Sequence, residues 1–278
     1  MSSGSAFGGG TVYQRFDRYH RTLHALLMLS FLGLALTGMP LLFSDAPWAA
    51  TLARVWGGFH RAGILHRTFA VVLIGVFSAH VFRLLHRLFV KKELHILWGP
   101  ASMTPQPRDV VEMLQHIRWF AGFGPRPRFD HFTYWEKFDY WAVFWGMGII
   151  GFSGLMLWFP VVFSHLLPGY AFNIAMLVHG EEALLAVGFI FTVHFFNSHL
   201  RPEKFPMDTV IFTGRVTERE LREERPEEFE RLQRERQLAR MRVDPAKPWV
   251  LPLGRTIGTL AVLVGLTVVV LIMYAFLA

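Results

Sequence analysis

Residues 65–86 read LHRTFAVVLIGVFSAHVFRLLH, an apolar stretch with histidines at positions 66, 80 and 86. Its interior from 68 to 82 carries no charge, and Arg67 and Arg83 flank it. A hydrocarbon core about 30 Å thick needs about 20 apolar helical residues, so the stretch spans a bilayer if both arginines reach the head groups. His66 and His80 then lie at membrane depth. An ionisable side chain is costly there and usually marks a functional site.

Four further segments have the length and composition of membrane spans. With residues 63–88, the expected spans are 22–43, 139–163, 172–199 and 254–277. The 278-residue chain is 53% hydrophobic, above the roughly 45–50% that is usual for soluble domains. This composition excludes a soluble nucleic-acid binder despite the net charge of +7. The sequence therefore predicts an all-α integral membrane helical bundle, with a four-helix core and a fifth, C-terminal transmembrane helix.

The positive charges predict how the chain is threaded. Of 28 Lys and Arg residues, 25 lie before the first span, between the second and third, or between the fourth and fifth, when Arg83, Arg87 and Arg255 at the ends of spans are counted with the adjoining connections. The positive-inside rule then places the N-terminus in the cytoplasm and the C-terminus in the periplasm, in a bacterial-type inner membrane. The expected domains are a four-helix transmembrane domain over 1–215, a charged cytoplasmic helix or linker over 216–248 and a C-terminal transmembrane helix over 249–278.

Two long connections lie on the expected cytoplasmic side. The first, residues 89–138, is rich in Pro and Gly around a short amphipathic piece, Val110–Phe120. The second, residues 216–243, alternates Glu with Arg, which is typical of a solvated helix with i,i+4 ion pairs. A docking surface for a cytoplasmic partner or for anionic lipid is the alternative interpretation. Histidines in the connections, such as His116 and His131, are expected at the surface.

The spacing of histidines within two spans predicts a cofactor. His66 and His80 are 14 residues apart, and His179 and His194 are 15 apart. At 1.5 Å and 100° per residue, the members of each pair lie about 21–22 Å apart and within about 40–60° of one face. Two b-type haems stacked across a bilayer require this arrangement, with each iron between imidazoles of two facing helices. The chain has no cysteine, so it holds neither covalent c-type haem nor a Cys-ligated cluster.

Two other classes of function compete with haem binding. A histidine relay in a proton channel or transporter also places imidazoles in spans, but such proteins carry charged residues near the midplane, whereas these spans keep their charges near the ends. A membrane anchor subunit without redox activity would carry histidines incidentally. The paired spacing favours haem over incidental histidines.

Four stretches resemble one family of membrane proteins. They are RTLHALLMLSFLGLALTG (21–38), LHRTFAVVLIGVFSAHVFRLLH (65–86), WEKFDYWAVFWGMGIIGFSGLMLWFP (135–160) and HGEEALLAVGFIFTVHFFNSHLRPEKFPMD (179–208). The chain resembles the membrane cytochrome b subunits of formate dehydrogenase (its gamma subunit), nickel–iron hydrogenase and thiosulfate reductase, especially relatives that accompany multihaem c-type cytochromes. The resemblance implies an electron conduit between a quinone/quinol pool and a separate redox subunit, either a multihaem c-type cytochrome or an iron–sulfur protein.

The resemblance also implies axial ligands. It assigns His66 and His179 to the outer haem b, and His24 and His194 to the inner one. The spacing argument instead pairs His80 with His194, so the inner pairing stays open between the two. His80 and the additional His199 exceed the family pattern of four ligands, which leaves a third haem or a quinone site as alternatives for them.

Polar residues near the ends of the spans complete the candidate site. Haem propionates need cations near the head groups, for which Arg67 and Arg201 are available. A quinone that reacts as substrate needs a proton exchanger beside a haem edge. The candidates are Asn197, His199 and Arg201 near the inner haem and Glu181 and Glu182 near the outer haem. For the two glutamates, compensation of helix N-terminal charge is the alternative.

Overall fold

Five long apolar helices dominate the computed structural model, which describes residues 10–205 and 207–277. The expected domains 1–215 and 249–278 therefore include residues outside the described ones, namely 1–9, 206 and 278. The five helices found in the described part are Arg18–Leu42, Phe59–Val90, Tyr134–Trp158, Tyr170–Leu200 and Val250–Leu277, each long and apolar enough to cross a membrane. They confirm that the five segments form helices able to span a membrane and that the fold is predominantly helical.

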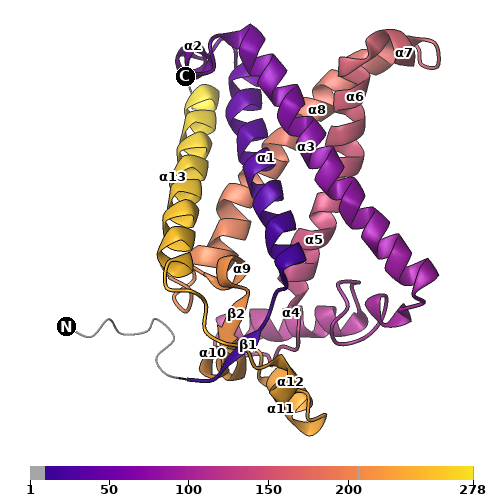
Figure 1. Cartoon of the computed structure of the whole chain (residues 1–278). Helices are drawn as coiled ribbons and strands as arrows, with labels where there is room; N and C mark the ends of the chain where they lie inside the picture. Colours follow the sequence, from indigo (N-terminus) through magenta and orange to yellow (C-terminus); the bar gives the residue numbers. More distant parts are fainter. Residues whose placement is uncertain (1–9, 206, 278) are drawn as a thin grey trace. The chain divides into compact units, whose positions relative to one another are not determined.

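The spans are assembled from the following helices (Figure 1). The first is α1 (Arg18–Leu42), the second is α3 (Phe59–Leu85) with η1 (His86–Val90), and the third is α5 (Tyr134–Gly146), η3 (Met147–Gly151) and α6 (Phe152–Trp158). The fourth is α8 (Tyr170–Phe189) with η4 (Ile190–His194) and η5 (Phe196–Leu200), and the fifth is α13 (Val250–Leu277). The short helices between spans are α2 (Pro47–Val55), η2 (Leu94–Ile96), α4 (Pro107–Phe120), α7 (Pro160–Ser164) and α9 (Val210–Thr213).

The chain divides into two compact units. Unit 1 comprises residues 1–21, 81–142 and 209–254, and unit 2 comprises residues 22–80, 143–208 and 255–278. The division falls inside α3, between His80 and Val81, and inside α5, between Ala142 and Val143. Unit 2 therefore holds the larger part of every span and the connections at 43–58 and 159–169, and unit 1 holds the connections at 91–133 and 209–249.

Prolines set the ends of two spans in unit 2. Pro40 lies in the last turn of α1 and has no N–H to donate to the Leu36 carbonyl. The indole Nε1 of Trp56 donates to that carbonyl at 3.2 Å instead. The third span was expected to continue to residue 163, but it ends at Trp158 because Pro160 starts the separate helix α7 and Phe159 leaves the helical conformation (φ −118°, ψ 55°).

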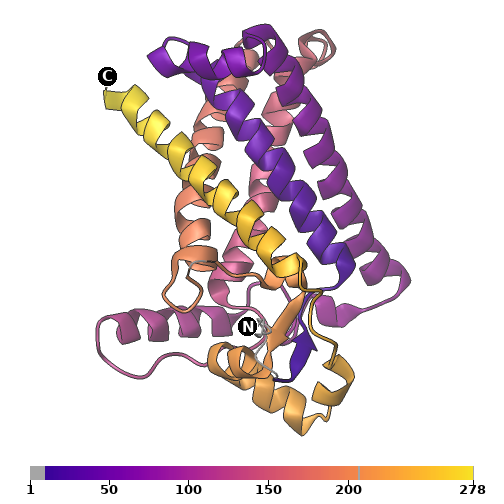
Figure 2. The ribbon, with the colours of Figure 1, turned by 60° about the vertical axis from the view of Figure 1, so that its left-hand side comes forward.

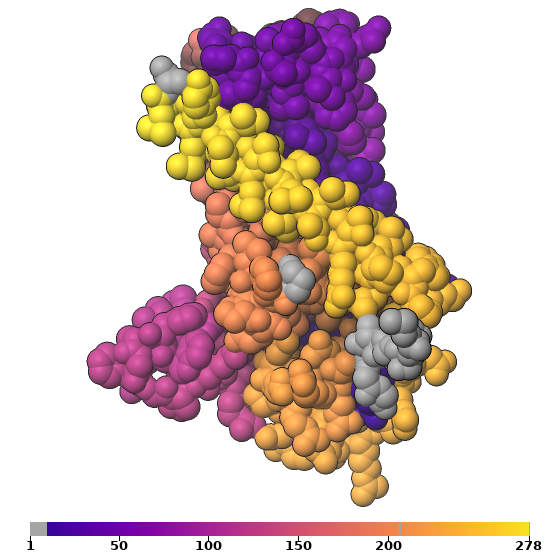
Figure 3. Space-filling model, turned by 90° about the vertical axis from the view of Figure 1, so that its left-hand side faces the viewer, coloured from indigo at the N-terminus to yellow at the C-terminus, as the bar shows by residue number. Residues whose placement is uncertain are grey.

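The fifth span packs against the fourth within unit 2. A Cβ added at Gly265 of α13 would lie 2.6 Å from Cδ1 of Phe191, so the glycine permits the ring's close approach. Phe191 is 1% exposed and also meets Phe31 of α1 edge to face, with ring centroids 5.7 Å apart. Figure 3 shows α13 lying as a continuous ridge over this face of the bundle. The fifth helix therefore belongs to the packed bundle although it falls outside the family resemblance.

Unit 1 contains a small sheet that the sequence did not predict. β1 (Val12–Gln14) pairs antiparallel with β2 (Arg215–Thr217), and Figures 1 and 2 show both strands beside the short helices that follow β2. These helices are α10 (Glu218–Glu224), α11 (Pro226–Arg234) and α12 (Leu238–Met241). The apolar core under the sheet consists of Tyr13, Val216, Leu221 and Phe229, with Leu238 and Met241 against it. Segments about 200 residues apart thus form one folded unit.

The segment expected as a charged helix over 216–243 instead forms the end of strand β2 and three short helices. Thr217 caps α10, because its Oγ1 accepts from the Glu220 backbone N–H at 3.2 Å while the Glu220 carboxylate accepts from the Thr217 N–H at 2.8 Å. Pro226 then interrupts the helix and restarts it as α11. Arg236, with φ +56°, ends α11. The expectation of a single solvated helix was wrong. It was based on the alternation of Glu with Arg and did not take these breaks into account.

Several charges of this segment are buried rather than solvated. Glu228 of α11 is 1% exposed, and its Oε2 accepts from Nη1 of Arg15 at 2.8 Å. Its Oε1 contacts Nδ1 of His131. Arg225 and Arg231 pair with Glu136 and Asp130 at 2.7 and 2.8 Å. The ion pairs therefore join all three chain segments of unit 1.

Two histidines of the connections are not at the surface. His116 is 7% exposed and stacks on Phe120, with ring centroids 4.6 Å apart. His131 lies in the buried ion network with Arg15 and Glu228. Both expectations of a surface position were wrong, because the connections fold onto one another and bury them.

Candidate functional site

His66 of α3 and His179 of α8 face each other inside unit 2. Their ring centroids are 6.3 Å apart, and the ring planes are inclined by 80°. Two imidazoles on opposite sides of one metal ion, each bonded at about 2.0–2.1 Å, place their ring centres about 6 Å apart. The spacing of the two rings is therefore suited to one metal ion between them.

Both imidazoles are oriented through Nδ1. Nδ1 of His179 lies 3.0 Å from the Ile150 carbonyl oxygen, to which only a protonated Nδ1 donates, and 3.2 Å from Oγ of Ser153. Nδ1 of His66 lies 3.2 Å from Oγ1 of Thr37. A proton on Nδ1 leaves the lone pair on Nε2, the atom that binds a metal. The partners of Nδ1 thus select the ligating tautomer.

The two hydroxyl partners are held in the same way. Oγ1 of Thr37 donates to the Gly33 carbonyl at 2.6 Å, and Oγ of Ser153 donates to the Ile149 carbonyl at 2.7 Å. Each hydroxyl proton is therefore engaged with the preceding turn, and the oxygen lone pairs remain to accept from an imidazole N–H. Thr37 and Ser153 are both buried.

A glycine follows each hydroxyl residue and makes room for the imidazole. A Cβ added at Gly38 would lie 2.9 Å from Cε1 of His66, and one added at Gly154 would lie 2.9 Å from Cε1 of His179. The dipeptides Thr37-Gly38 and Ser153-Gly154 thus support the two histidines in matching fashion. Our sequence interpretation missed them, although a hydroxyl–glycine pair repeated in two spans is a signal that points to this support.

Alanine at Gly38 or Gly154 is expected to push the adjacent imidazole away from its partner ring, because real Cβ atoms do not approach other atoms to 2.9 Å. The ligand environment should change while the helices remain, since alanine favours helix. The measurement is the visible spectrum and haem content of purified Gly154→Ala and Gly38→Ala. Gly75→Ala on α3 is the matched control, because an added Cβ there meets nothing within 4 Å. An unchanged spectrum in both variants would contradict the assigned role of the glycines.

A second group of histidines lies toward the other end of unit 2. His24 of α1 is close enough to His194 and His199 for electrostatic interaction with both. His80 of α3 meets Phe144 edge to face, with ring centroids 6.3 Å apart. His24 therefore interacts electrostatically with two histidines of the fourth span, which agrees with the family-derived pairing of His24 with His194. Nδ1 of His199 is buried without a hydrogen-bond partner among the described residues.

A π-helical turn accounts for the unequal histidine spacings. The turn η4 (Ile190–His194) lies between His179 and His194, whereas α3 is regular from His66 to His80. A π-bulge accommodates one extra residue in a helix. The 15-residue separation in the fourth span is therefore geometrically equivalent to the 14-residue separation in the second.

Two other π-helical turns, η3 and η5, also adjoin the site. The turn η3 (Met147–Gly151) contains Ile150, whose carbonyl accepts from His179. The turn η5 (Phe196–Leu200) carries His199. Such turns occur mostly as short interruptions of α-helices and often at functional sites.

The predicted propionate and quinone residues lie at the ends of the same helices. Nε of Arg201 donates to the Asn197 backbone carbonyl at 2.8 Å, so the arginine ends η5 beside His199. Arg67 donates to the Gly63 carbonyl at 3.1 Å and lies over the Trp158 ring, 5.8 Å from its centroid.

Glu181 and Glu182 lie two and three residues after His179 in α8. Glu181 is exposed and Glu182 is half-buried. Because Gly169 starts α8 about three turns earlier, neither glutamate lies in the first turn of the helix. Compensation of the helix N-terminal charge, which falls off within the first turn, therefore does not explain them.

Among the described residues, no group of three or more His, Asp or Glu is arranged to hold a bare metal ion. A porphyrin supplies four nitrogen ligands itself and needs only two axial groups from the protein, so a pair of imidazoles fits haem better than a bare ion. Comparison with protein-family models finds no match, and comparison with curated proteins finds none either.

Proposed function

We propose that the chain is a b-type dihaem membrane cytochrome subunit, which carries electrons across the bilayer between a quinone/quinol pool and a partner redox protein. It would serve as the quinone-reacting subunit of an oxidoreductase complex. The observation that supports this most directly is the pair His66 and His179, whose ring separation of 6.3 Å suits two axial ligands of one iron.

The protein's contribution at the outer site is ligation and tuning. Iron held between these imidazoles in haem supplies a one-electron redox couple. The Ile150 carbonyl and the Thr37 and Ser153 hydroxyls accept from Nδ1–H, which fixes the rings and makes Nε2 more basic. The surrounding apolar spans exclude water. Arg67 is the cation available to a propionate on this side.

For the inner site we propose His194 with His24 as ligands. The electrostatic interaction of His24 with His194 supports this pairing, and so does the family resemblance. His80 remains the alternative inner ligand. His199 then has a buried Nδ1 that can exchange a proton with a quinone oxygen, while Arg201 and Asn197 hold the end of η5 in place.

We propose that the partner is a separate multihaem c-type cytochrome or iron–sulfur protein, since a chain without cysteine holds neither clusters nor covalent haem. The charge bias of 25 among 28 cations supports a cytoplasmic N-terminus and a periplasmic C-terminus in a bacterial-type inner membrane. Unit 1 would then face the cytoplasm.

The test is the visible spectrum of the purified full-length chain, with haem quantified per chain. A dithionite-reduced α-band of b-type haem, with two haems per chain, is the expected result. A third haem would assign His80 as a ligand. A chain without a reduced α-band would refute the cytochrome assignment and favour a histidine relay or a structural anchor, which proton-flux measurements in liposomes distinguish.

A further inference from the structure

Helix α4 in unit 1 turns its polar side inward. Three charged or polar side chains of α4, Asp109, Glu112 and His116, are each less than 9% exposed. In a helix on the surface of a soluble domain, such positions are normally apolar and face a core. The inverted pattern indicates that the apolar side of α4 has a different environment from water.

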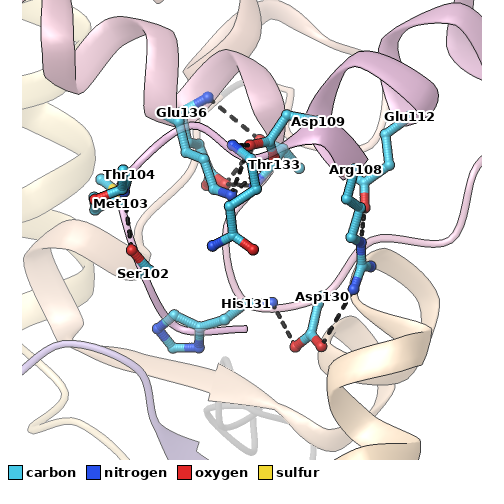
Figure 4. A network of polar contacts seen from close by, with 12 residues as sticks. Ser102, Met103, Thr104, Arg108, Asp109, Glu112, Asp130, His131, Thr133 and Glu136 are labelled. Carbon is cyan, nitrogen blue, oxygen red and sulfur yellow. Dashed lines mark hydrogen bonds and ion pairs between the residues drawn. The ribbon is translucent and has the colours of Figure 1, made fainter. Parts of the chain in front are cut away.

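Ion pairs hold the polar side of α4 in place. Asp109 binds Nζ of Lys137 at 2.8 and 2.9 Å, and Nη2 of Arg108 binds Glu227 of α11 at 2.6 Å. His116 contacts the Tyr134 hydroxyl at 3.1 Å. Figure 4 shows Arg108, Asp109 and Glu112 directed from α4 toward the chain around Asp130 and Thr133.

Contacts with the start of the third span hold α4 beside the first turns of α5. Tyr134 and Lys137 belong to the first turn of the third span, and Trp141, one turn further, donates to the Met103 carbonyl at 3.0 Å. Because α4 is fixed to the start of a span, it lies at the level where that span enters the bilayer.

The apolar side chains of α4 form one exposed face. Apart from Val111, which is 52% exposed and lies to one side, they are Val110, Met113, Leu114, Ile117 and Phe120. At about 100° per residue, these positions fall in one arc of about 120°. Val110, Leu114, Ile117 and Phe120 are each more than half exposed. Figure 3 shows the segment that contains α4 (magenta) projecting to one side of the rest of unit 1 (orange).

The residues that precede and follow α4 in the sequence include cations and further exposed apolar side chains. Leu94, Trp98 and Phe123 are 66%, 63% and 72% exposed. Exposed cations of the same segment are Lys91, Lys92 and Arg118, and Arg126 is half-buried over the Trp119 ring. An apolar helix face with aromatic residues and nearby cations is typical of a helix that lies in the head-group region of an anionic bilayer.

We propose that α4 is an interfacial membrane helix, whose apolar face, including Val110, Leu114 and Ile117, lies among the acyl chains while Arg118 and its neighbouring cations contact anionic lipid head groups. The occupant of this face is the same bilayer that the five spans cross, because α4 is attached to the start of one of them. The proposal depends on that crossing and is independent of haem binding.

The absence of cysteine makes the test direct, since each introduced cysteine is the only one in the chain. Leu114→Cys in the full-length chain, in nanodiscs of phosphatidylcholine and phosphatidylglycerol with one chain per disc, should react with a charged, membrane-impermeant maleimide at least about tenfold more slowly than Arg219→Cys. Arg219 is the matched control, because it lies on helix α10 of the same unit with its side chain 84% exposed. A spin label at position 114 should be more accessible to oxygen than to a water-soluble nickel complex.

Equal maleimide rates at positions 114 and 219 would overturn the proposal. So would protection of position 114 that arises only with two chains per disc, because the occupant would then be a second copy of the chain. Haem content measured on the same samples keeps the two proposals separate: haem with an unprotected position 114 refutes only the interfacial helix, and protection without haem refutes only the cytochrome.

Discussion

His66→Ala is expected to remove one of the two proposed haems and leave the other bound. The reason is that His66 faces His179, with ring centroids 6.3 Å apart. Among the described residues, no other imidazole ring contact involves this pair. His179→Ala should have the same effect, whereas His194→Ala should remove the second haem. The measurement is haem per chain together with the α-band of the reduced protein.

His86→Ala is the matched control for this experiment. His86 follows the same helix, is exposed and stacks only on Phe82, so its removal should leave both haems in place. Added imidazole should restore the lost α-band of His66→Ala if the cavity left by the side chain admits it. Full haem content in both His66→Ala and His179→Ala would refute the assignment of these ligands.

Glu228→Gln is expected to destabilise unit 1 by about 3–5 kcal/mol, because removal of one partner leaves a buried charge uncompensated. The Arg15 side chain, 7% exposed, would lose its carboxylate partner, and His131 would lose its contact on the same group. The measurement is the urea midpoint of unit 1 in the full-length chain, followed by pulse proteolysis of the connections.

Glu230→Gln is the matched control on the same helix. Glu230 pairs with Arg128 at 2.5 Å, but both side chains are more than half exposed, so its loss should cost less than about 1 kcal/mol. Equal midpoints for the Glu228 and Glu230 variants would show that the buried network does not stabilise the unit.

The same network predicts that acid destabilises unit 1. Burial by itself would raise the pKa of Glu228, but Arg15, His131 and Arg225 outweigh it and lower the pKa to about 2 from its ordinary 4.5. Burial, with Arg15 nearby, lowers the pKa of His131 below 6.5 although Glu228 opposes the change. In both cases the unfolded chain binds more protons than the folded one, so stability falls as the pH falls.

The two groups act over different pH ranges. The contribution of His131 should decline below about pH 6.5, and that of Glu228 between about pH 4.5 and 2. Glu112 acts in the opposite sense, because burial raises its pKa and its contribution is lost as the pH rises. Urea midpoints of the wild type and Glu228→Gln from pH 7 to pH 3 should therefore converge toward low pH. A constant difference between them would contradict this assignment.

The spans could be predicted from the sequence because a bilayer imposes a simple requirement of about 20 apolar residues per helix. The segment from Val250 to Leu277 meets this requirement by composition alone. Residues 68–82 meet it once the flanking arginines are placed at the head groups. The matched depths of His66 with His179 followed from helix geometry, since rise and rotation per residue are constant.

The π-helical turn η4 could not be predicted in this way. Spacing counted on a regular helix left His179 and His194 about 60° apart in rotation. Backbone hydrogen bonds of the i→i+5 type absorb one residue between them. The approach of His24 to His194 and His199 likewise depends on how α1 packs against the fourth span.

The sequence by itself determined five membrane spans and the depth of their histidines, because hydropathy and helix periodicity are local properties. Only the tertiary structure decided that Thr37-Gly38 and Ser153-Gly154 support the two facing imidazoles, and that Arg15, His131 and Glu228 meet in one buried network. Such contacts join segments from 26 to 213 residues apart. Their formation depends on the packing of distant helices and loops, which no local pattern specifies.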